Sequence, residues 1–386
     1  MYLQKNNSTG AGNPSPNGGG WEGAVSLLKE LIATPSFSKE EDQTAAIICR
    51  FLGERGVVHY RSSNNVWAKN KYFDESKPTI LLNSHHDTVK PNKGYILDPF
   101  APIEIEGKLF GLGSNDAGGA LVSLIATFLS FFHKQDLKYN LVIAATAEEE
   151  ISGTNGLEML LSDKVFISET GCSLAPPFRG RGLEWACAIV GEPTQMQMAV
   201  AEKGLLVLDC IAEGKAGHAA REEGENAIYK ALKDIEWISS YQFSKVSDLL
   251  GPVKMSVTVI ETDNKQHNVV PAQCKFVIDV RVNELYTHEE IITTIKQHLQ
   301  SEVKPRSIRL RSTAIALEHP LIKAGINLGR TYYGSPTTSD KALMPFPALK
   351  IGPGDSARSH TADEFIYVDE IKEGIELYIQ LLNQLL

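Results

Sequence analysis

The sequence has few cysteines and no long apolar run, and both absences exclude classes of protein. Its five cysteines are an odd number and include no CxxC pair, so neither a disulfide framework nor a cysteine-rich zinc site is expected. No apolar run approaches the roughly 20 residues that a bilayer span needs, and the first residues contain no apolar signal core. We therefore expect reduced thiols, no membrane partner and a cytoplasmic location.

Positive charge is also scarce. The chain has 38 Lys and Arg against 47 Asp and Glu, a net charge of −9, which argues against nucleic acid or an anionic membrane as the main partner. Its 386 residues are 42% hydrophobic and 22% charged, an ordinary globular balance with enough length for two domains. A small molecule is the expected partner.

Strand-like and helical patterns alternate through most of the chain, which predicts an α/β fold with a mixed, mostly parallel sheet and helices on both faces. Between 204 and 310 the order becomes strand, helix, strand, strand, helix, which predicts an inserted, smaller α+β domain of ferredoxin-like type. The catalytic domain would then comprise 1–203 and 311–386. Strands are expected at 66–70, 78–83, 140–147, 186–190, 205–212, 253–262, 273–282 and 348–351, and helices at 21–33, 40–56, 118–133, 154–162, 224–239, 287–300, 320–332 and 368–385.

Two segments interrupt this pattern. Residues 6–20 are rich in Gly, Asn, Ser and Pro and are interpreted as a flexible arm. Residues 168–185 contain Pro-Pro and Arg-Gly-Arg-Gly and exceed the usual connection length, so we interpret them as an exposed loop insertion.

Metal-ligand types gather just after apolar runs. His85, Glu150, Glu192 and His360 each follow a predicted strand, and Asp116 lies in a glycine-rich turn. Open α/β sheets place their chemistry at the carboxyl ends of strands, so two imidazoles and three carboxylates would meet there. Such a set suits a pair of divalent metal ions.

The segment SHHDTV has an internal geometry that separates its two histidines. Residues two apart in an extended chain face the same way, so Asp87 can support His85 while His86 faces elsewhere. We interpret His86 as a packed histidine. The nearby GLG of the Asp116 turn does not complete a GxGxxG fingerprint, and Lys108-Leu109-Phe110 before it is a poor strand, which argues against a dinucleotide site.

Three adjacent glutamates end the strand predicted at 140–147. Clustered carboxylates repel one another, so a buried run of this kind requires a cation, whereas an exposed run would be a solvated turn. The functional interpretation divides the run: Glu150 binds metal, Glu149 takes a proton from a metal-bound water, and Glu148 has a supporting role.

Five motifs, in order, resemble the dinuclear zinc metallopeptidase family of acetylornithine deacetylase, succinyl-diaminopimelate desuccinylase, aminoacylase and carboxypeptidase G. They are SHHDTV, GLGSNDAGG, TAEEE, GEPT and GPGDSARSHTADE, and the resemblance covers about 22 to 386 without the 168–185 segment. It implies two zinc ions, with cobalt or manganese also suited to nitrogen and oxygen ligands. It further implies that Asp116 bridges both ions, that His85 and Glu192 complete one site, that Glu150 and His360 complete the other, and that Glu149 is the general base and later the acid. The family's common Asp-Glu-Glu is Glu-Glu-Glu here, a departure at Glu148 that touches no ligand.

The inserted domain carries further family-like segments. The resemblance implies a lid and dimerisation domain, hence a homodimer, in which His218 reaches the partner subunit's site and stabilises the oxyanion. Asn268 and Arg281 match positions of substrate contact, and the planar fork of Arg281 suits a substrate carboxylate. Lys203 is a weaker candidate for the same contact.

Within the family, AEKGLLVLDCIAEGKAGHAA and SPTTSD look most like the acetylornithine deacetylase branch. The expected activity is removal of an acetyl or succinyl group from an amino acid such as ornithine, citrulline or lysine, in arginine or lysine biosynthesis. A succinyl-diaminopimelate desuccinylase or a dipeptidase is the alternative within the family. A catalytically silent binding protein predicts a missing ligand or base, and none is missing; a dehydrogenase would show a nicotinamide-dependent change in absorbance.

Overall fold

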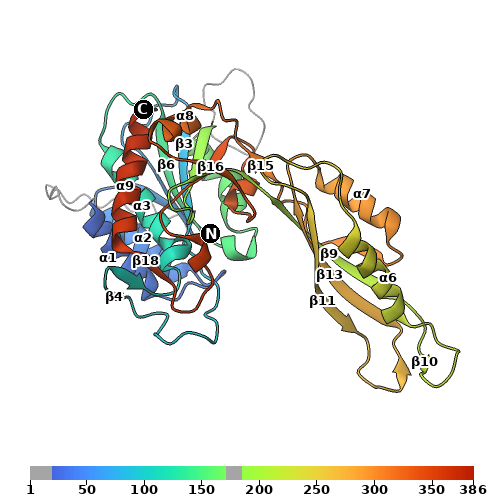
Figure 1. Cartoon of the computed structure of the whole chain (residues 1–386). Coiled ribbons are helices and arrows are strands. Elements are labelled where there is room, and N and C mark those ends of the chain that lie inside the picture. The colour runs from blue at the N-terminus through green and yellow to red at the C-terminus, as the bar shows by residue number, and fades with distance from the viewer. Residues whose placement is uncertain (1–19, 171–184) are drawn as a thin grey trace. The chain divides into compact units, whose positions relative to one another are not determined.

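The computed structural model describes residues 20–170 and 185–386, which form two compact units (Figure 1). Unit 1 comprises residues up to 200, 315–333 and 339–386, and unit 2 comprises 201–314 and 334–338. The expected flexible arm at 6–20 lies outside the described residues except for Gly20. So does most of the expected insertion at 168–185, whose first residues 168–170 instead end helix α5.

Unit 1 is built on a mixed sheet with the strand order β1-β2-β6-β3-β7-β17-β8. Its central pairs β6–β3, β3–β7 and β7–β17 are parallel and its outer pairs are antiparallel, so the sheet is mixed, as predicted. The strands are β1 (His59–Ser62), β2 (Asn65–Lys69), β3 (Thr79–His85), β6 (Asn140–Thr146), β7 (Trp185–Val190), β8 (Met198–Glu202) and β17 (Ala348–Lys350), and β16 (Tyr332–Ser335) also pairs with β8. β15 (Thr313–Ala314) pairs with the last two residues of β8, and all four of these residues are assigned to unit 2.

The central strands are buried along their whole length, which means that both faces of the sheet are covered. All seven residues of β3 and of β6 are buried. One face packs Leu81 and Val142 against Leu160 of α4 and Phe166 of α5. The unit's helices are α1 (Trp21–Ile32), α2 (Asp42–Glu54), α3 (Gly119–Phe132), α4 (Leu157–Ser162), α5 (Lys164–Thr170), α8 (Pro320–Asn327) and α9 (Val368–Asn383), with short turns η1 (Ser114–Gly118), η2 (Glu149–Ile151), η3 (Asp340–Leu343) and η4 (Ser356–Arg358).

The helical stretch Ser114–Phe132 is long and apolar enough to cross a bilayer by length and composition alone. The expectation that no segment approaches this length is therefore wrong. However, 83% of its most apolar window is buried inside the protein, and α3 contacts α1, α9 and the sheet. Its apolarity is that of a core helix, packed on several sides at once.

Two further expectations needed correction. Lys108–Phe110, judged a poor strand, is β5, which pairs with β4 (Ile103–Ile105) and β18 (Phe365–Tyr367) in a separate three-stranded sheet. Of the three residues of β5, only Leu109 is buried. The helix expected at 320–332 ends at Asn327, because Gly329 takes a left-handed conformation (φ 73°) and the chain then enters β16. In both places the local apolar pattern did not predict the secondary structure, which depends on pairing with other strands: β5 pairs with β4 and β18, and β16 pairs with β8.

Unit 2 is an antiparallel sheet in the order β11-β13-β9-β14, with helices on one face. Burial alternates along β9 and β13, as expected when one face packs against helices and the other does not. Its order along the chain is the split βαβ order that was predicted, and its strand order is ferredoxin-like. The elements are β9 (Gly204–Glu213), β10 (Gly217–His218), α6 (Ala227–Ser240), β11 (Lys254–Thr262), β12 (Val269–Val270), β13 (Gln273–Val282), α7 (His288–His298) and β14 (Glu302–Pro305).

Candidate metal centre

Unit 1 brings the five predicted metal ligands together at the carboxyl ends of its parallel strands. They form two groups, His85 with Asp116 and Glu192, and Glu150 with Asp116 and His360. Within each group the potential ligand atoms lie within 4.8 Å of one another, and Asp116 is common to both. A shared carboxylate with two oxygens is the arrangement that two neighbouring divalent ions need.

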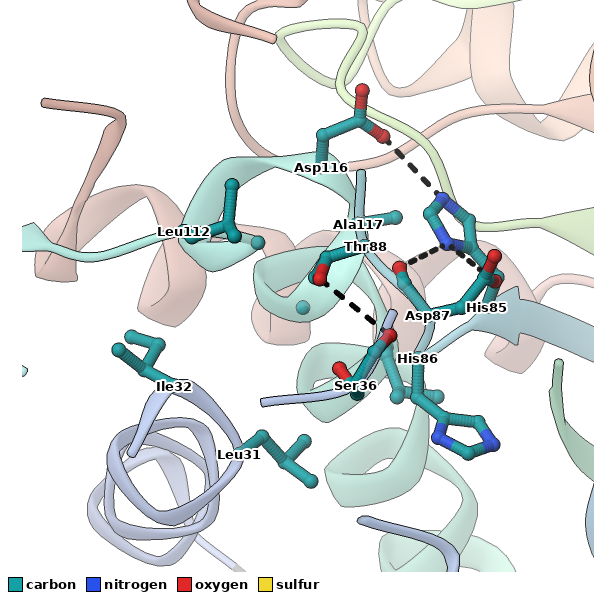
Figure 2. A pocket seen from close by; sticks show the side chains of 13 residues that line it. Leu31, Ile32, Ser36, His85, His86, Asp87, Thr88, Leu112, Asp116 and Ala117 are labelled. Carbon is teal, nitrogen blue, oxygen red and sulfur yellow. Dashed lines mark hydrogen bonds and ion pairs between the residues drawn. The ribbon is translucent and has the colours of Figure 1, made fainter. Parts of the chain in front are cut away.

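His85 ends β3 and is only 1% exposed. Its Nδ1 lies 3.0 Å from the main-chain oxygen of Asp87, which can only accept, so neutral His85 carries its proton on Nδ1. Nε2 then presents a lone pair 3.4 Å from Asp116 Oδ1 and 3.9 Å from Glu192 Oε1, as Figure 2 shows for Asp116. The buried Nε2 has no hydrogen-bond partner. A lone pair that faces two carboxylates needs a cation between them, so these residues fit a metal ion.

The second group is more open. His360 Nε2 lies 3.0 Å from Glu150 Oε2 and 3.7 Å from Asp116 Oδ2, with its side chain 55% exposed. The hydrogen bond and charge of Glu150 raise the pKa of His360 to about 9 when only protein groups are present. Asn115 holds the loop that carries His360, since its side chain accepts from Asp355 N and donates to Asp355 O, both at 3.0 Å.

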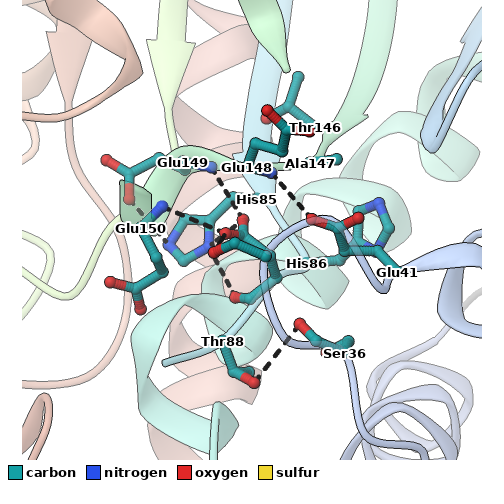
Figure 3. Close-up of polar contacts among 12 residues, drawn as sticks. Ser36, Glu41, His85, His86, Thr88, Thr146, Ala147, Glu148, Glu149 and Glu150 are labelled. Atoms are coloured by element: carbon teal, nitrogen blue, oxygen red, sulfur yellow. Dashed lines mark hydrogen bonds and ion pairs between the residues drawn. The ribbon is translucent and has the colours of Figure 1, made fainter. Parts of the chain in front are cut away.

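The turn of three glutamates is held in place by hydrogen bonds that its backbone N–H groups donate to other residues (Figure 3). Asp87 Oδ1 accepts from Glu149 N at 3.0 Å, and Asp87 Oδ2 accepts from Glu150 N at 3.2 Å. Asp87 was expected to support His85 through its carboxylate. That carboxylate lies 3.4 Å from His85 Nδ1 but also fixes the glutamate turn, while the main-chain oxygen makes the shorter contact with His85.

Each glutamate of the turn has a different environment. Burial raises the pKa of Glu149 well above its usual range, and the nearby carboxylates of Glu192 and Asp340 raise it further against the opposing charge of His85. Glu148 is 5% exposed and accepts hydrogen bonds from Asn155 N and Nδ2, at 3.3 and 2.8 Å. Glu149 therefore has the elevated pKa of a general base, whereas the carboxylate of Glu148 is hydrogen-bonded to Asn155 in the loop that follows it.

Several buried acids near the centre were given no role from the sequence, although Asp340 ends the SPTTSD segment and Glu364 ends the GPGDSARSHTADE motif. Glu41 accepts from Glu148 N at 3.2 Å, and Asp340 accepts from Thr146 Oγ1 at 2.8 Å. Glu364 is 1% exposed and accepts from backbone N–H groups of the Asp116 turn. Burial and the charge of Asp116 raise the pKa of Glu364 to about 8. Each acid acts across more than 100 positions of sequence, so no local spacing could indicate it.

His86 is packed away from the metal ligands, as Figures 2 and 3 show. Its Nδ1 lies 2.9 Å from Thr44 Oγ1 and its Nε2 lies 2.9 Å from Asn64 O, and the residue is 6% exposed. Burial lowers the pKa of His86 from 6.5 to about 4. The imidazole is therefore a neutral bridge between α2 and the loop before β2.

Replacing His86 with Gln should reduce the loss of stability in acid. A histidine whose pKa is lower when folded than when unfolded stabilises the fold above pH 6.5, and this contribution falls as the pH drops toward 4. Between pH 7 and pH 5 the wild type should lose roughly 2 kcal/mol more of its free energy of unfolding than His86→Gln. Urea unfolding at both pH values measures this difference; equal losses in the two proteins would show that His86 is not held neutral.

The four residues expected to contact substrate all belong to unit 2. His218 is exposed in β10, and its Nδ1 accepts from Ala220 N at 3.1 Å, which leaves the proton of the neutral ring on Nε2. Asn268 O accepts from Ala219 N at 3.0 Å, so Asn268 and His218 lie in one hairpin region.

Arg281 and Lys203 lie elsewhere in unit 2. Arg281 makes a bidentate pair with Asp279, with Nε at 2.8 Å and Nη2 at 3.0 Å from its oxygens. A substrate carboxylate would have to use the remaining guanidinium nitrogen or displace Asp279. Lys203 Nζ donates to Pro252 O at 2.7 Å, and burial followed by the charges of Lys254 and Arg281 lowers its pKa.

The sequence profile of peptidase family M20/M25/M40 matches residues 81–384, most of the chain and all five ligand candidates. The chain belongs to this family. Membership confirms the prediction of a metal-dependent hydrolase that acts on amide bonds, with a small molecule as its substrate.

Two relatives in the M20/M25/M40 family cover almost the whole chain. The succinyl-diaminopimelate desuccinylase of Stenotrophomonas maltophilia (strain R551-3) is 24% identical, over 94% of this chain and 99% of its own length. That of Rickettsia bellii (strain OSU 85-389) is 23% identical, over 94% of this chain and 96% of its own. These names correspond to the alternative activity of the sequence analysis rather than to its first choice, acetylornithine deacetylation.

Solved structures of M20 family members share the fold. The metallo-carboxypeptidase Sso-CP2 of Sulfolobus solfataricus has a TM-score of 0.72 at 17% identity, covering 94% of this chain and 99% of that chain. The YXEP protein of Bacillus subtilis, described as a dinuclear metal binding peptidase, has a TM-score of 0.64 at 16% identity, covering 94% and 97%. At these identities the likeness concerns the fold.

Proposed function

We propose that the chain is a desuccinylase that hydrolyses the amide bond of an N-succinylated amino acid, with two zinc ions and Glu149 as its general base. The observation that carries the proposal is that Asp116 is shared by two groups of candidate metal ligands, while Glu149, which belongs to neither group, lies 4.0 Å from His85 Nε2. The nitrogen and oxygen donors suit zinc, and cobalt or manganese could replace it.

His85, Asp116 and Glu192 would hold one ion, and Asp116, Glu150 and His360 the other. When bound, two such ions would lower the pKa of a water molecule and polarise the amide carbonyl. The protein contributes ligands held on rigid elements. His85 is fixed at the end of β3, and Glu150 is fixed through its amide by Asp87.

Glu149 performs the proton transfers. Its carboxylate takes a proton as the water oxygen bonds to the amide carbon, and it returns that proton to the nitrogen as the carbon–nitrogen bond breaks. The raised pKa of Glu149 supports both roles, because a base that must later act as an acid works best with a pKa near the working pH.

Residues of unit 2 complete the proposal. In the proposed dimer, His218 would reach the partner subunit's site, where its Nε2 proton suits donation to the oxyanion that forms at the amide oxygen. Arg281, Asn268 and Lys203 would contact carboxylates of the substrate, which a succinyl group supplies in addition to that of the amino acid. We further propose that the enzyme is a cytoplasmic homodimer, which sedimentation velocity of the purified protein would test for the oligomeric state.

A substrate panel tests the acyl group. Purified, zinc-loaded protein should hydrolyse N-succinyl-diaminopimelate with a kcat/KM at least about tenfold above N-acetylornithine and dipeptides, because a substrate without the second carboxylate loses a charged contact with Arg281 or Lys203. Preference for N-acetylornithine would instead support the acetylornithine deacetylase reading, and preference for dipeptides a peptidase. Chelation should abolish all three activities and added Zn²⁺ should restore them.

The names of the two nearly full-length relatives favour the succinylated substrate and lysine biosynthesis. The motifs that resemble the acetylornithine deacetylase branch keep arginine biosynthesis as the second candidate. Both activities use the same centre, so the panel distinguishes the substrates and chelation tests the dependence on metal.

A further inference from the structure

Glu364 makes an unusual set of contacts with the turn that carries Asp116. Its Oε1 accepts from Asn115 N and Asp116 N, both at 2.9 Å, and its Oε2 accepts from Gly113 N at 3.2 Å. Its main-chain oxygen accepts from Gly111 N at 2.9 Å. One residue thus receives four amide groups from a six-residue turn.

The turn has little structure of its own to replace these bonds. Only Ser114 N donates within the turn, to Gly111 O at 3.1 Å, and Leu112 N donates to Pro99 O at 2.8 Å. Gly113 is left-handed (φ 74°), and a Cβ there would lie 2.5 Å from the methyl group of Thr88. The backbone conformation therefore depends on an external acceptor, and Glu364 supplies most of it.

Glu364 belongs to neither group of candidate metal ligands. Its two carboxylate oxygens are directed to backbone N–H groups, and the residue is 1% exposed immediately before β18. A buried carboxylate is costly unless it is hydrogen-bonded, so its retention beside the acidic centre requires the amide contacts. Glu364 contacts the centre through the backbone N–H of Asp116.

We propose that Glu364 is a positioning residue for the bridging carboxylate, which it aligns with both metal sites by holding the Gly113–Asp116 backbone. The inference rests on the proposed metal centre. Because Asp116 belongs to both ligand groups, a displaced turn weakens both sites together. A variant of a ligand in only one group would affect chiefly that site.

Metal titration of the full-length protein tests the proposal directly. Metal-free wild type and Glu364→Gln would be titrated with Zn²⁺ by calorimetry and with Co²⁺ by visible absorption, whose bands report ligand geometry. A glutamine offers one acceptor oxygen, and its NH₂ group would oppose one of the backbone N–H donors. We expect both affinities to fall about 10–100-fold, the usual effect of losing a group that orients a ligand.

Asp234 provides a matched control. It is 3% exposed in α6 and likewise accepts from two backbone amides, Gln300 N at 3.0 Å and Ser301 N at 2.9 Å, but it belongs to unit 2. Asp234→Asn should lower the thermal midpoint as a buried carboxylate variant does, yet keep both metal affinities and the cobalt spectrum of wild type. If Glu364→Gln does not fold, Glu364→Asp keeps the charge with a shorter reach and should show the same paired loss.

The outcomes separate this proposal from the function on which it rests. Wild-type protein that binds fewer than two ions overturns the metal centre and the positioning role with it. Wild-type protein that binds two ions while a folded Glu364 variant binds both with unchanged affinity and spectrum overturns the positioning role alone. Equal loss in Glu364→Gln and Asp234→Asn would show a general effect of stability, which also contradicts it.

Discussion

Glu149→Gln should bind two metal ions as the wild type does and lose about 10²–10⁴-fold in kcat, the usual cost of removing a general base. Glu149 belongs to neither ligand group, and its Oε2 lies 4.0 Å from His85 Nε2, close to the centre without completing it. The hydrogen bond from Glu149 N to Asp87 Oδ1 does not involve the Glu149 side chain, so the turn should keep its conformation. The measurements are kcat on the best substrate of the panel and metal content by mass spectrometry.

The adjacent glutamate is the matched control. Glu148→Gln makes the same chemical change one residue away, where the side chain bonds Asn155 rather than facing the ligands. It should keep kcat within a fewfold of wild type and lose some thermal stability. Near-normal turnover in Glu149→Gln, or an equal loss in Glu148→Gln, would remove Glu149 from the role of general base.

Asp116→Ala should have the larger effect, because it removes a ligand from both groups at once. We expect neither site to retain tight binding and turnover to fall on the order of 10⁴-fold or more, since proton transfer and metal chemistry are lost together. Metal ions should also stop stabilising the fold. In wild type, Zn²⁺ at 1,000 times its Kd should add about 4 kcal/mol per site to the free energy of unfolding.

His360→Ala provides the comparison for Asp116→Ala. It removes a ligand from the Glu150 group only, so one ion should remain tightly bound and part of the stabilisation by metal should persist. Calorimetric titration gives the stoichiometry and thermal unfolding with and without Zn²⁺ gives the stabilisation. If Asp116→Ala still bound two ions tightly, the bridging role would have to be abandoned.

Much of the fold could be predicted because its strands are short apolar runs with polar ends. The ligands after β3, β6 and β7 were expected at one edge of the sheet because parallel strands end there together, and the structure gathers them there. The Glu148–Glu150 turn was recognisable because three adjacent carboxylates after a buried strand need an explanation.

The supporting contacts could not be predicted. Asp87 reaches the glutamate turn across 62 positions, and Glu364 reaches Asp116 across 248. Such pairs depend on how β18 and the loops pack against η1. An acidic residue in a loop has no periodic sequence pattern that would predict that contact. The short strand β5 was also missed. One of its partners, β4, precedes it across a tight turn, but the other, β18, lies more than 250 positions further along the chain.

The anchoring of the Asp116 turn by Glu364 also has a consequence for how the protein is made. At about 5–20 residues per second, a ribosome needs roughly 12–50 s to synthesise the 248 positions between these two residues. During that time the turn lacks the acceptor for four of its amides, and His360 does not yet exist in the nascent chain. The centre therefore matures late in translation, and an incomplete chain presents only part of a metal-binding set to the cell.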